Sequence, residues 1–408
     1  MPSAPPPPPA GQLDPGTALR RAPGGVLVAL HRGEPIAALI PISERHELST
    51  PPIQPEAAYR LSRFCYLRRD EHGMLAESPL AHAVIRLLGR HSVDLAHALA
   101  EPRSPVRLAL LLPELSREEI VALLSVFVGT RMASACDRGG TPEVDAGPAL
   151  SPWSFHDLLF HSRSRAGRHG YPIGATYPLG RAPPPVPAVK PPMSPVVLPL
   201  PRPSLARLAD HDTTLTRALE ERRSIREDAA PPITAAALGE FMYRVARVRS
   251  IREEGGVEIT SRPYPSAGAC YALELYLNVD RCDGLLRGLY HYNPLEHGLE
   301  PLSPPTPDTE RQLAEGWAYT ARRCRPQILV TITARFQRVA WKYESIAYAT
   351  ILKDVGVLYQ TMYLVATAMG LGPCALGCGD ADRFSRMIAE DYQAESSVGE
   401  FILGGRPT

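Results

Sequence analysis

Apolar residues recur at strand-like intervals near the start of the chain. Two short apolar runs, Val26–Leu30 and Pro35–Ile40, flank the polar residues 31–34, and this pattern predicts a β-hairpin. Apolar and polar residues roughly alternate over Tyr59–Leu67, which predicts a further strand.

Two stretches that follow have the spacing of amphipathic helices. Ser78-Pro79 is typical of a helix start, with serine as the cap and proline at the first helical position. The expected buried face of this helix is Leu80, Val84, Leu87 and Leu88. Ser116 and Glu119 have the spacing of a capping box. Behind it, one stripe is formed by Ile120, Leu123, Leu124 and Phe127.

Helices of this size among short strands predict a winged helix-turn-helix module over residues 23–150. Such a module could bind DNA through a basic recognition helix, or it could hold a peptide as an added strand. The second helix begins Arg117-Glu118-Glu119 and is otherwise mostly apolar, which suits phosphate groups poorly. We therefore favour a peptide clamp, or a structural remnant of one, over a DNA-binding module.

The second half of the chain alternates helix and strand signals. Thr234 is placed to cap a helix with the apolar face Leu238, Phe241, Met242 and Val245. Leu273–Val279 and Gln327–Thr333 alternate as strands do. A long helix carries a seam with spacings of three and four, formed by Ile351, Val355, Leu358, Met362, Val365 and Met369. This seam is typical either of a dimer-forming helix or of a buried core helix.

Composition sets the domain organisation. A length of 408 residues indicates two or three domains, and 44 prolines are about twice the usual share. We expect a disordered proline-rich tail over residues 1–22 and a docking helix with a proline-rich linker over 151–204. The last domain then covers residues 205–408, and the fold class is α+β.

Charge and cysteine content narrow the function classes. The net charge of +1 favours neither nucleic acid nor a membrane surface, and no apolar run reaches about 18 residues. The start of the chain lacks the features of a signal peptide, and seven scattered cysteines suit a reducing cytoplasm. The spacings of the histidines and cysteines fit no common zinc pattern, so we expect no metal site.

Lysine is rare in this chain. Only Lys190, Lys342 and Lys353 are lysine among 44 basic residues. Because lysine can lose its proton in a protein whereas arginine cannot, each retained lysine is a candidate for acid–base chemistry.

Three motifs could carry chemistry. The cluster Arg222-Arg223-Ser224-Ile225-Arg226 offers guanidinium groups and a hydroxyl to a phosphate. The small-residue turn Pro265-Ser266-Ala267-Gly268 lets the backbone approach a flat ring closely. The run Gly370-Leu371-Gly372-Pro373-Cys374-Ala375 fits a dinucleotide-binding fingerprint, but it follows a predicted helix instead of a strand, so we reject that interpretation.

In this order, with Trp341-Lys342-Tyr343 and Gly404-Gly405-Arg406-Pro407, the motifs resemble the FMN-binding frame of the nitroreductase fold. The pair Lys342-Tyr343 resembles that of azoline dehydrogenases of the SagB/ThcOx, or cyanobactin oxidase, type. The resemblance implies a homodimer built on the long helix, and it implies the cofactor contacts. It places Arg222 and Arg406 at the FMN phosphate, Arg223, Ser224 and Arg226 along the phosphate, ribityl chain and ring edge, Pro265, Ser266, Ala267 and Gly268 against the flavin, and Leu376 and Gly377 at the turn facing flavin N5.

The same resemblance implies that thiazoline or oxazoline rings in a ribosomally made peptide are oxidised to azoles, with dioxygen restoring the flavin. Tyrosine and lysine have solution pKa values of ~10, so one must be tuned to act as a base near neutral pH. We expect Tyr343 to be the base and Lys342 to favour its ionised form, although the roles could be exchanged. A cyclodehydratase is an expected partner. The alternatives are an NAD(P)H-dependent nitro- or flavin reductase and a non-catalytic peptide-binding subunit.

Overall fold

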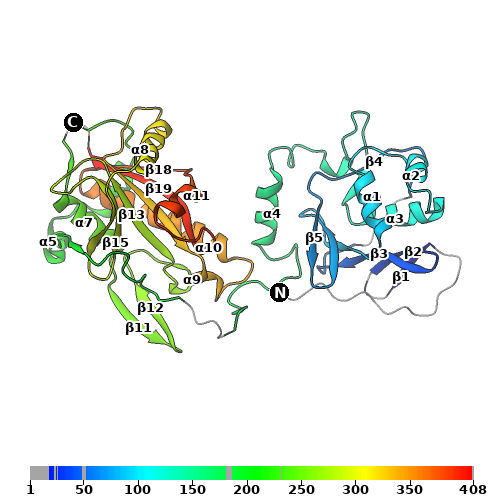
Figure 1. Ribbon diagram of the computed structural model, residues 1–408, viewed down its shortest axis with the longest axis horizontal. Helices are drawn as coiled ribbons and strands as arrows, with labels where there is room; N and C mark the ends of the chain where they lie inside the picture. The colour runs from blue at the N-terminus through cyan, green and yellow to red at the C-terminus, as the bar shows by residue number, and fades with distance from the viewer. Residues whose placement is uncertain are drawn as a thin grey trace. The chain divides into compact units, whose positions relative to one another are not determined.

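The computed structural model describes residues 18–22, 24, 26–47, 52–180, 186–229 and 231–406. It divides into two compact units, residues 1–174 and 175–408 (Figure 1). The division falls inside the segment 151–204 that the sequence predicts to be a connector. Both units combine helices with mostly antiparallel sheets, which confirms the α+β class.

The N-terminal unit is built on a six-stranded antiparallel sheet with the strand order β1-β2-β3-β7-β6-β5. Its strands are β1 (Leu19–Ala22), β2 (Val26–His31), β3 (Glu34–Pro41), β5 (Tyr66–Asp70), β6 (Gly73–Glu77) and β7 (Ala83–Leu87). The predicted hairpin is confirmed as β2 and β3, which pair from Leu27↔Leu39 to His31↔Glu34. The end of the predicted proline-rich tail forms β1, whereas residues 1–17 lie outside the described part.

Helices cover one face of this sheet. They are α1 (Arg90–Ala98), α2 (Pro105–Leu111) and α3 (Arg117–Gly129), while a small second sheet pairs β4 (Tyr59–Leu61) with β8 (Ala133–Ala135). The capping box of Ser116 and Glu119 is confirmed at the start of α3. The predicted stripe behind it is buried in the core against β2 and β3. A helix buried in this way has no free face for a major groove.

Two predictions for this unit are wrong. The residues after Ser78 form a turn and then β7, and all five residues of Ala83–Leu87 are buried. Ile85 packs in the core under the helices and Val84 in a cluster on the other face, so both faces of β7 are covered. A strand buried on both faces has a continuous apolar run, which resembled a helix face by spacing alone. The predicted strand Tyr59–Leu67 is two strands, β4 and β5, in different sheets.

These differences leave the winged helix-turn-helix interpretation unconfirmed, because a six-stranded sheet replaces its few short strands. The amphipathic segment after Trp153 is confirmed as α4 (Phe155–Arg163), which Ser154 caps.

The C-terminal unit contains a seven-stranded sheet with the order β18-β19-β17-β13-β15-β16-β9. Its strands are β9 (Leu198–Pro199), β13 (Leu273–Val279), β15 (Gly288–Asn293), β16 (Gly298–Ser303), β17 (Ile328–Arg335), β18 (Leu371–Leu376) and β19 (Glu395–Gly405). The predicted strands near 273–279 and 327–333 are confirmed as β13 and β17, which pair with each other at the centre. A separate hairpin, β11 (Ser250–Glu254) and β12 (Val257–Ser261), projects from this unit (Figure 1).

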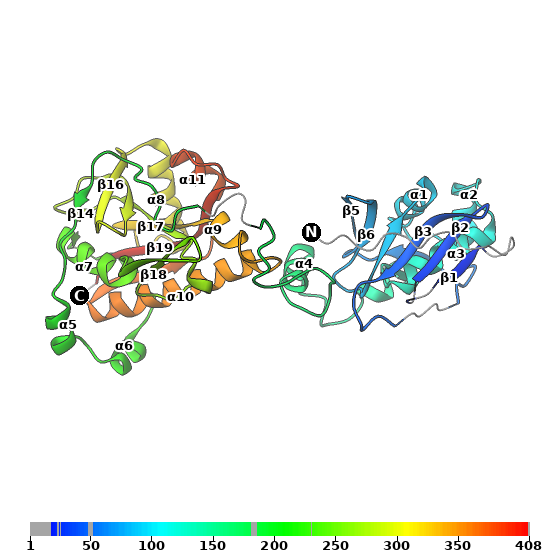
Figure 2. The same cartoon turned by 90° about the horizontal axis from the view of Figure 1, so that it is seen from below.

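Seven helices belong to the described part of this unit, and α10 and α11 make the most contacts with the sheet. The seven helices are α5 (Leu205–His211), α6 (Leu215–Glu221), α7 (Ala235–Ala246), α8 (Pro307–Tyr319), α9 (Gln337–Ala340), α10 (Ala347–Ala368) and α11 (Ala381–Met387). Thr234 caps α7 as predicted, and the four apolar residues of its predicted face are buried. The long predicted helix is α10, which lies along β18 and β19 in Figure 2. The first four residues of its seam, Ile351 to Met362, are buried in the main core.

The described connector residues 186–199 pack on the C-terminal unit. Lys190 is buried, and its Nζ lies 2.6 Å from Glu390 and 2.5 Å from Glu395. Arg338 donates to Val186 O, and β9 pairs with β16 at the edge of the sheet. The buried Lys190 is therefore engaged in structural ion pairs, which leaves Lys342 and the exposed Lys353 of α10 as the lysines to consider for chemistry.

Candidate active site

Two of the predicted motifs meet at one end of the sheet. Leu273 at the start of β13 pairs with Ala334 near the end of β17. Because the strands are antiparallel, the turn that precedes β13 and the corner that follows β17 lie at the same end. This register brings the turn 265–268 to Lys342 and Tyr343.

Gly268 is the point of contact. Its φ is +56°, a left-handed conformation that glycine adopts without strain. A Cβ at this position would lie 2.8 Å from Lys342 Nζ and would overlap the Tyr343 hydroxyl. Lys342 Nζ also donates to Gly268 O at 3.3 Å, and it lies 5.6 Å from the Tyr343 ring centroid. Both predicted catalytic groups therefore converge on one glycine.

A buried carboxylate fixes this turn. Asp354 of α10 accepts hydrogen bonds from Ser266 Oγ at 2.5 Å and from Ala267 N at 3.1 Å. Burial raises the pKa of Asp354 above its usual range, although the two hydrogen bonds act in the opposite direction. The sequence analysis missed Asp354. Its signal was an acidic residue between Ile351 and Val355 in an apolar helix seam.

The predicted phosphate cluster follows α6 and runs beside β18. Ile225 N donates to Pro373 O at 2.8 Å, which fixes the segment to this strand. Ser224 Oγ lies 2.7 Å from the hydroxyl of Tyr363, and that hydroxyl also accepts from Ala375 N at 2.8 Å. The Arg222 guanidinium lies 5.4 Å from the centroid of the Tyr363 ring. Tyr363 of α10 thus connects the cluster to the sheet, and the sequence analysis did not identify it.

Arg406 follows β19 at the same place. Gly405 pairs with Leu371, and a Cβ on Gly372 would meet Gly405 O on one side and the Ile225 side chain on the other. Within the described residues, no carboxylate forms an ion pair with the four guanidinium groups, which are those of Arg222, Arg223, Arg226 and Arg406. Arg222 lies over the Tyr363 ring and Arg226 beside Cys374 of β18, and with Arg223 and Arg406 on the same two segments these cations would suit a doubly charged phosphate.

The predicted turn at Leu376 and Gly377 ends β18. Leu376 O accepts from the Tyr359 hydroxyl at 3.2 Å, and a Cβ on Gly377 would meet nothing within 4 Å. Beneath the turn lies Glu400, which is 5% exposed, and burial raises its pKa above the usual range. The turn therefore presents open backbone above a buried carboxyl group.

One helix holds all three motifs. Asp354, Tyr359 and Tyr363 of α10 contact the 265–268 turn, the 376–377 turn and the arginine cluster, respectively. Nine residues separate Asp354 from Tyr363, which is roughly 13 Å along a helix axis. The motifs thus form one elongated site, with the Lys-Tyr pair at one end and the arginines at the other.

A cavity of about 640 Å³ opens beside the Lys-Tyr end. Its lining includes Gly268, Ala269, Trp341 and Lys342 on one side and the tip of the β11–β12 hairpin on the other. Backbone carbonyls of Cys270 and Val186 hold the Arg338 side chain on its floor. This volume is within the range of small-molecule sites.

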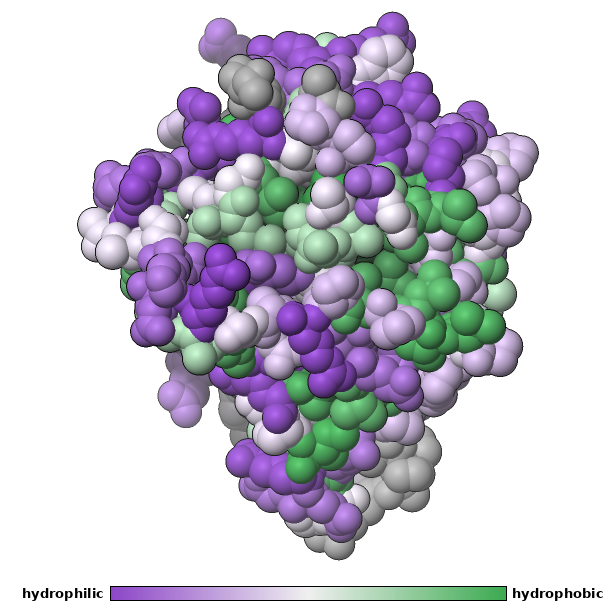
Figure 3. All heavy atoms as spheres, turned by 90° about the vertical axis from the view of Figure 1, so that its left-hand side faces the viewer, coloured by the Kyte–Doolittle hydropathy of each residue, from purple (hydrophilic) through white to green (hydrophobic). Residues whose placement is uncertain are grey.

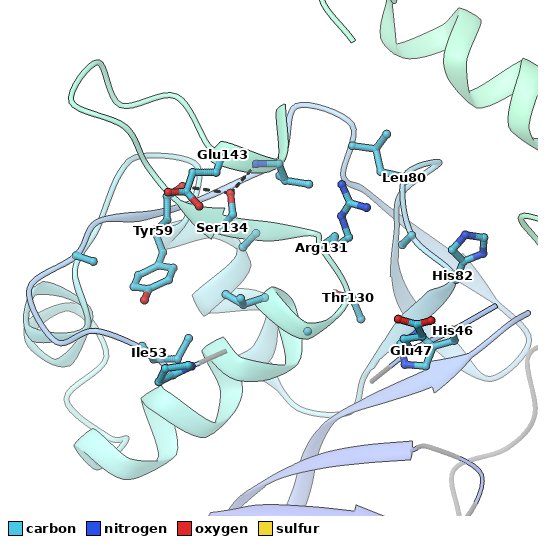
Figure 4. Close-up of a pocket in the computed structure, with 18 of the residues that line it drawn as sticks. His46, Glu47, Ile53, Tyr59, Leu80, His82, Thr130, Arg131, Ser134 and Glu143 are labelled. Carbon is cyan, nitrogen blue, oxygen red and sulfur yellow. Dashed lines mark hydrogen bonds between the residues drawn. The ribbon is translucent and has the colours of Figure 1, made fainter. Parts of the chain in front are cut away.

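The N-terminal unit has a cavity of its own, of about 640 Å³ (Figure 4). Tyr59 of β4, Ser134 of β8 and Arg131 at the end of α3 lie around it. Ser62 N donates to Met132 O, and Cys136 N donates to Ala58 O. These bonds show that even-numbered residues of this segment point their backbone groups at β4. Because successive residues of a strand point these groups to opposite sides, the N–H and C=O groups of the lining residues Ala133 and Ala135 point away from β4. One edge of β8 is thus turned toward this cavity.

Neither a membrane-spanning helix nor a metal-binding cluster is found among the described residues. No helix there is long and apolar enough to cross a bilayer. No group of three or more histidine, cysteine, aspartate or glutamate side chains in the described ranges could hold a metal ion.

Sequence comparisons place the chain in a family. The nitroreductase family profile matches residues 219–404. A protein of Methanocaldococcus jannaschii that is named as a nitroreductase is 30% identical over 167 residues, which make up 40% of this chain and 78% of that protein. The chain belongs to the nitroreductase family. This nitroreductase-family protein is accordingly an oxidoreductase, as the motifs predict.

Other relatives process peptides. Residues 59–170 match the profile of the cyanobactin oxidase ThcOx. The microcin B17-processing protein McbC of Escherichia coli is 33% identical over 27% of this chain and 42% of its own. The trifolitoxin-processing protein TfxB of Rhizobium leguminosarum is 26% identical over 40% of this chain and 44% of its own. The chain thus spans less than half the length of these two relatives. The predicted resemblance to nitroreductases and to cyanobactin-type oxidases is confirmed.

Proposed function

We propose that this nitroreductase-family protein is an FMN-dependent oxidase that converts thiazoline or oxazoline rings of a ribosomally made peptide to azoles. The observation that carries the proposal is the convergence of Lys342 and Tyr343 on Gly268 at the mouth of a cavity. Two groups able to move a proton, placed beside the expected flavin-contacting turn, suit removal of two hydrogens from a ring. A reductase of small nitro compounds does not need such a pair.

The residues present fit a flavin mononucleotide. Arg222, Arg223, Arg226 and Arg406 would hold its phosphate, and Ser224 would lie beside them. The turns Pro265–Gly268 and Leu376–Gly377 would contact the ring with backbone, because both consist largely of small residues or open backbone. When bound, FMN supplies a two-electron acceptor that takes a hydride from the substrate ring and is returned to its oxidised form by dioxygen.

The protein's own part is to hold the ring and take the proton. Azoline oxidation removes a hydride from one ring carbon and a proton from another. Tyr343 would accept that proton as a phenolate, and the Lys342 ammonium would stabilise the phenolate; the reverse assignment stays open. Asp354 would keep Gly268 against the pair through Ser266 and Ala267.

We also propose three partners, which are a precursor peptide, a cyclodehydratase and a second copy of this chain. A peptide strand would add to β8 in the N-terminal cavity beside Ala133, since Ala135 O already accepts from Ser134 Oγ at 3.2 Å. McbC and TfxB are named as processing proteins of microcin B17 and trifolitoxin, which favours a precursor peptide as substrate. Because the proposed substrate carries azoline rings, a cyclodehydratase that forms them is a proposed partner.

The third proposed partner is a second copy of this chain, in a homodimer. Tyr348, Leu352 and Val357 of α10 and Leu215 and Leu219 of α6 are all more than a third exposed. Figure 3 shows further apolar surface at the α5 end of the C-terminal unit, where Leu205 is 48% exposed. Leu352→Asp should then shift the protein to monomer in light scattering, and a parental mass for this variant would argue against a dimer through this face.

The test of the proposed chemistry is a pair of substitutions. Lys342→Met and Tyr343→Phe should keep bound FMN and its absorbance but lose anaerobic bleaching by a thiazoline peptide. General acid–base groups contribute roughly 10²- to 10⁴-fold, so a loss in that range is expected. Parental bleaching rates in both variants would refute the assigned roles. Bleaching by NADPH alone, with none by the peptide, would support a nitro- or flavin reductase instead.

A further inference from the structure

A short turn crosses the outside of the Lys342 corner. It consists of residues 175–180 and is named the 175–180 turn. Tyr177 N donates to Lys342 O at 3.1 Å, and Thr176 Oγ1 donates to Glu344 Oε2 at 2.9 Å. Gly180 N closes the turn by donating to Tyr177 O at 2.8 Å. The turn is thus hydrogen-bonded to residues on both sides of Tyr343.

Tyr177 has an unfavourable backbone but an accessible ring. Its φ is +53°, a left-handed conformation that is uncommon for a residue with a side chain. Its ring lies 5.3 Å from the Trp341 ring at an interplanar angle of 59°, and the residue is 44% exposed. A strained residue that leaves its aromatic ring at the rim of a cavity adds little to the core. Such strain is typical of functional sites.

Trp341 contributes its ring to the cavity. Its indole Nε1 is buried from solvent and has no hydrogen-bond partner within the described part of the chain. A buried indole N–H usually finds an acceptor. Because Trp341 Nε1 has almost no accessible surface, a molecule in the cavity reaches the ring of Trp341, which lines the cavity with Lys342, and not its N–H.

The opposite wall of the cavity is open backbone. Gly255 and Gly256 at the tip of the β11–β12 hairpin line it, and a Cβ on either would meet nothing within 4 Å. A lining that combines two aromatic rings with bare glycine backbone suits a flat group carried on an extended chain.

We propose that Tyr177 and Trp341 form a stacking platform that positions the heterocycle of the substrate peptide beside Lys342 and Tyr343. This inference rests on the proposed function and deepens it, because it assigns recognition of the ring to the 175–180 turn. Both residues are positioning residues, since neither accepts the proton nor holds the expected cofactor.

The platform acts on binding more than on chemistry. The turn reaches Lys342 through a backbone hydrogen bond, which Tyr177→Ala retains. Removing the ring should therefore raise KM and leave kcat within about twofold. Aromatic pairs of this kind correspond to a rise of roughly 3- to 10-fold. Trp341→Ala removes the second ring of the platform and should raise KM by a similar factor of roughly 3- to 10-fold.

The experiment uses the full-length, FMN-loaded protein and synthetic peptide amides that carry one thiazoline, the corresponding thiazole or, as a binding control, the uncyclised cysteine. Initial rates by mass spectrometry give KM and kcat for the first peptide, and calorimetry gives Kd for the other two. Tyr177→Phe keeps the ring and should behave as the parent. Tyr392→Ala, which removes a 51% exposed tyrosine outside the cavity lining, is the matched control.

We expect KM and the thiazole Kd to rise together in Tyr177→Ala and Trp341→Ala, while binding of the uncyclised cysteine peptide stays at the parental level. Parental KM and Kd in Tyr177→Ala would overturn the inference and leave the proposed function intact. Loss of bound flavin in that variant would assign the turn a structural role and would also overturn it. A parent protein that neither oxidises nor binds the two ring-bearing peptides would instead end the proposed function.

Discussion

The substitution Gly268→Ala tests the geometry of the site most sharply. Gly268 has a φ of +56°, and its Cα faces Lys342 Nζ and the Tyr343 hydroxyl. Alanine adds one methyl group, which would lie 2.8 Å from Nζ and closer still to the hydroxyl. Ordinary contacts between heavy atoms are ~3.5 Å or longer, so both groups must retreat by on the order of 1 Å.

Two magnitudes follow from this displacement. The left-handed backbone costs an alanine about 1–2 kcal/mol, which lowers the free energy of unfolding by that amount. The displaced ends belong to flexible side chains, so we expect no larger loss of stability. A misplacement of ~1 Å at reacting groups can reduce the rate about 10²-fold. The variant should therefore fold and bind FMN, yet oxidise a thiazoline peptide about 100 times more slowly.

Gly284→Ala is the control for backbone strain. Gly284 has a φ of +84°, and its added Cβ would meet only the Ala235 methyl at an ordinary 3.4 Å. Urea unfolding should show a similar loss of stability in both variants, while only Gly268→Ala loses turnover. If Gly268→Ala retains the rate of Gly284→Ala, the Lys-Tyr pair does not act at Gly268 and the reasoning is wrong.

Four other variants, with Arg311→Ala as a control, probe the rest of the site. Asp354→Asn weakens the hydrogen bonds that hold the 265–268 turn. It should lower the free energy of unfolding by about 1–3 kcal/mol in urea titrations, and activity should fall as well. An unchanged urea midpoint would contradict the anchoring role of Asp354. Arg222→Ala and Arg406→Ala should each weaken FMN binding roughly 10- to 100-fold in fluorescence titrations. Arg311→Ala, on the exposed face of α8, should leave the affinity unchanged. Equal affinities in all three variants would refute the proposed phosphate site. Glu400 has a raised pKa in the folded protein, so its stabilising contribution is present at acid pH and is lost as pH rises from 4.5 through the folded pKa. Glu400→Gln should therefore become more stable relative to the parent over that pH range. Parallel curves of unfolding free energy against pH for the two proteins would show that the carboxyl group is not buried as described.

Local signals predicted several elements well. The capping box at Ser116 and the cap at Thr234 each involve residues within one helical turn, so the sequence alone contains the complete interaction. The residues after Ser78 show the opposite case. Their apolar spacing suited a helix, but burial on both faces of a sheet made Ala83–Leu87 a strand. That burial depends on distant segments, which a local pattern cannot report.

The same contrast holds in the site. Motifs predicted the arginine cluster, the small-residue turn and the Lys-Tyr pair, and the roles of these residues stay predictions. Their proximity depends on the register between β13 and β17, and on contacts from α10. Asp354, Tyr359 and Tyr363 are 87, 17 and 139 residues away from the groups they contact, so no spacing rule could connect them.

Mass spectrometry of a heterocyclised peptide tests the central claim most directly. The FMN-loaded protein would be incubated in air with a peptide that carries thiazoline or oxazoline rings, without NAD(P)H. The account predicts a loss of ~2 mass units for each ring, because azole formation removes two hydrogens. An unchanged peptide mass with the yellow, folded protein, together with rapid NADPH-dependent reduction of a nitroarene, would contradict it.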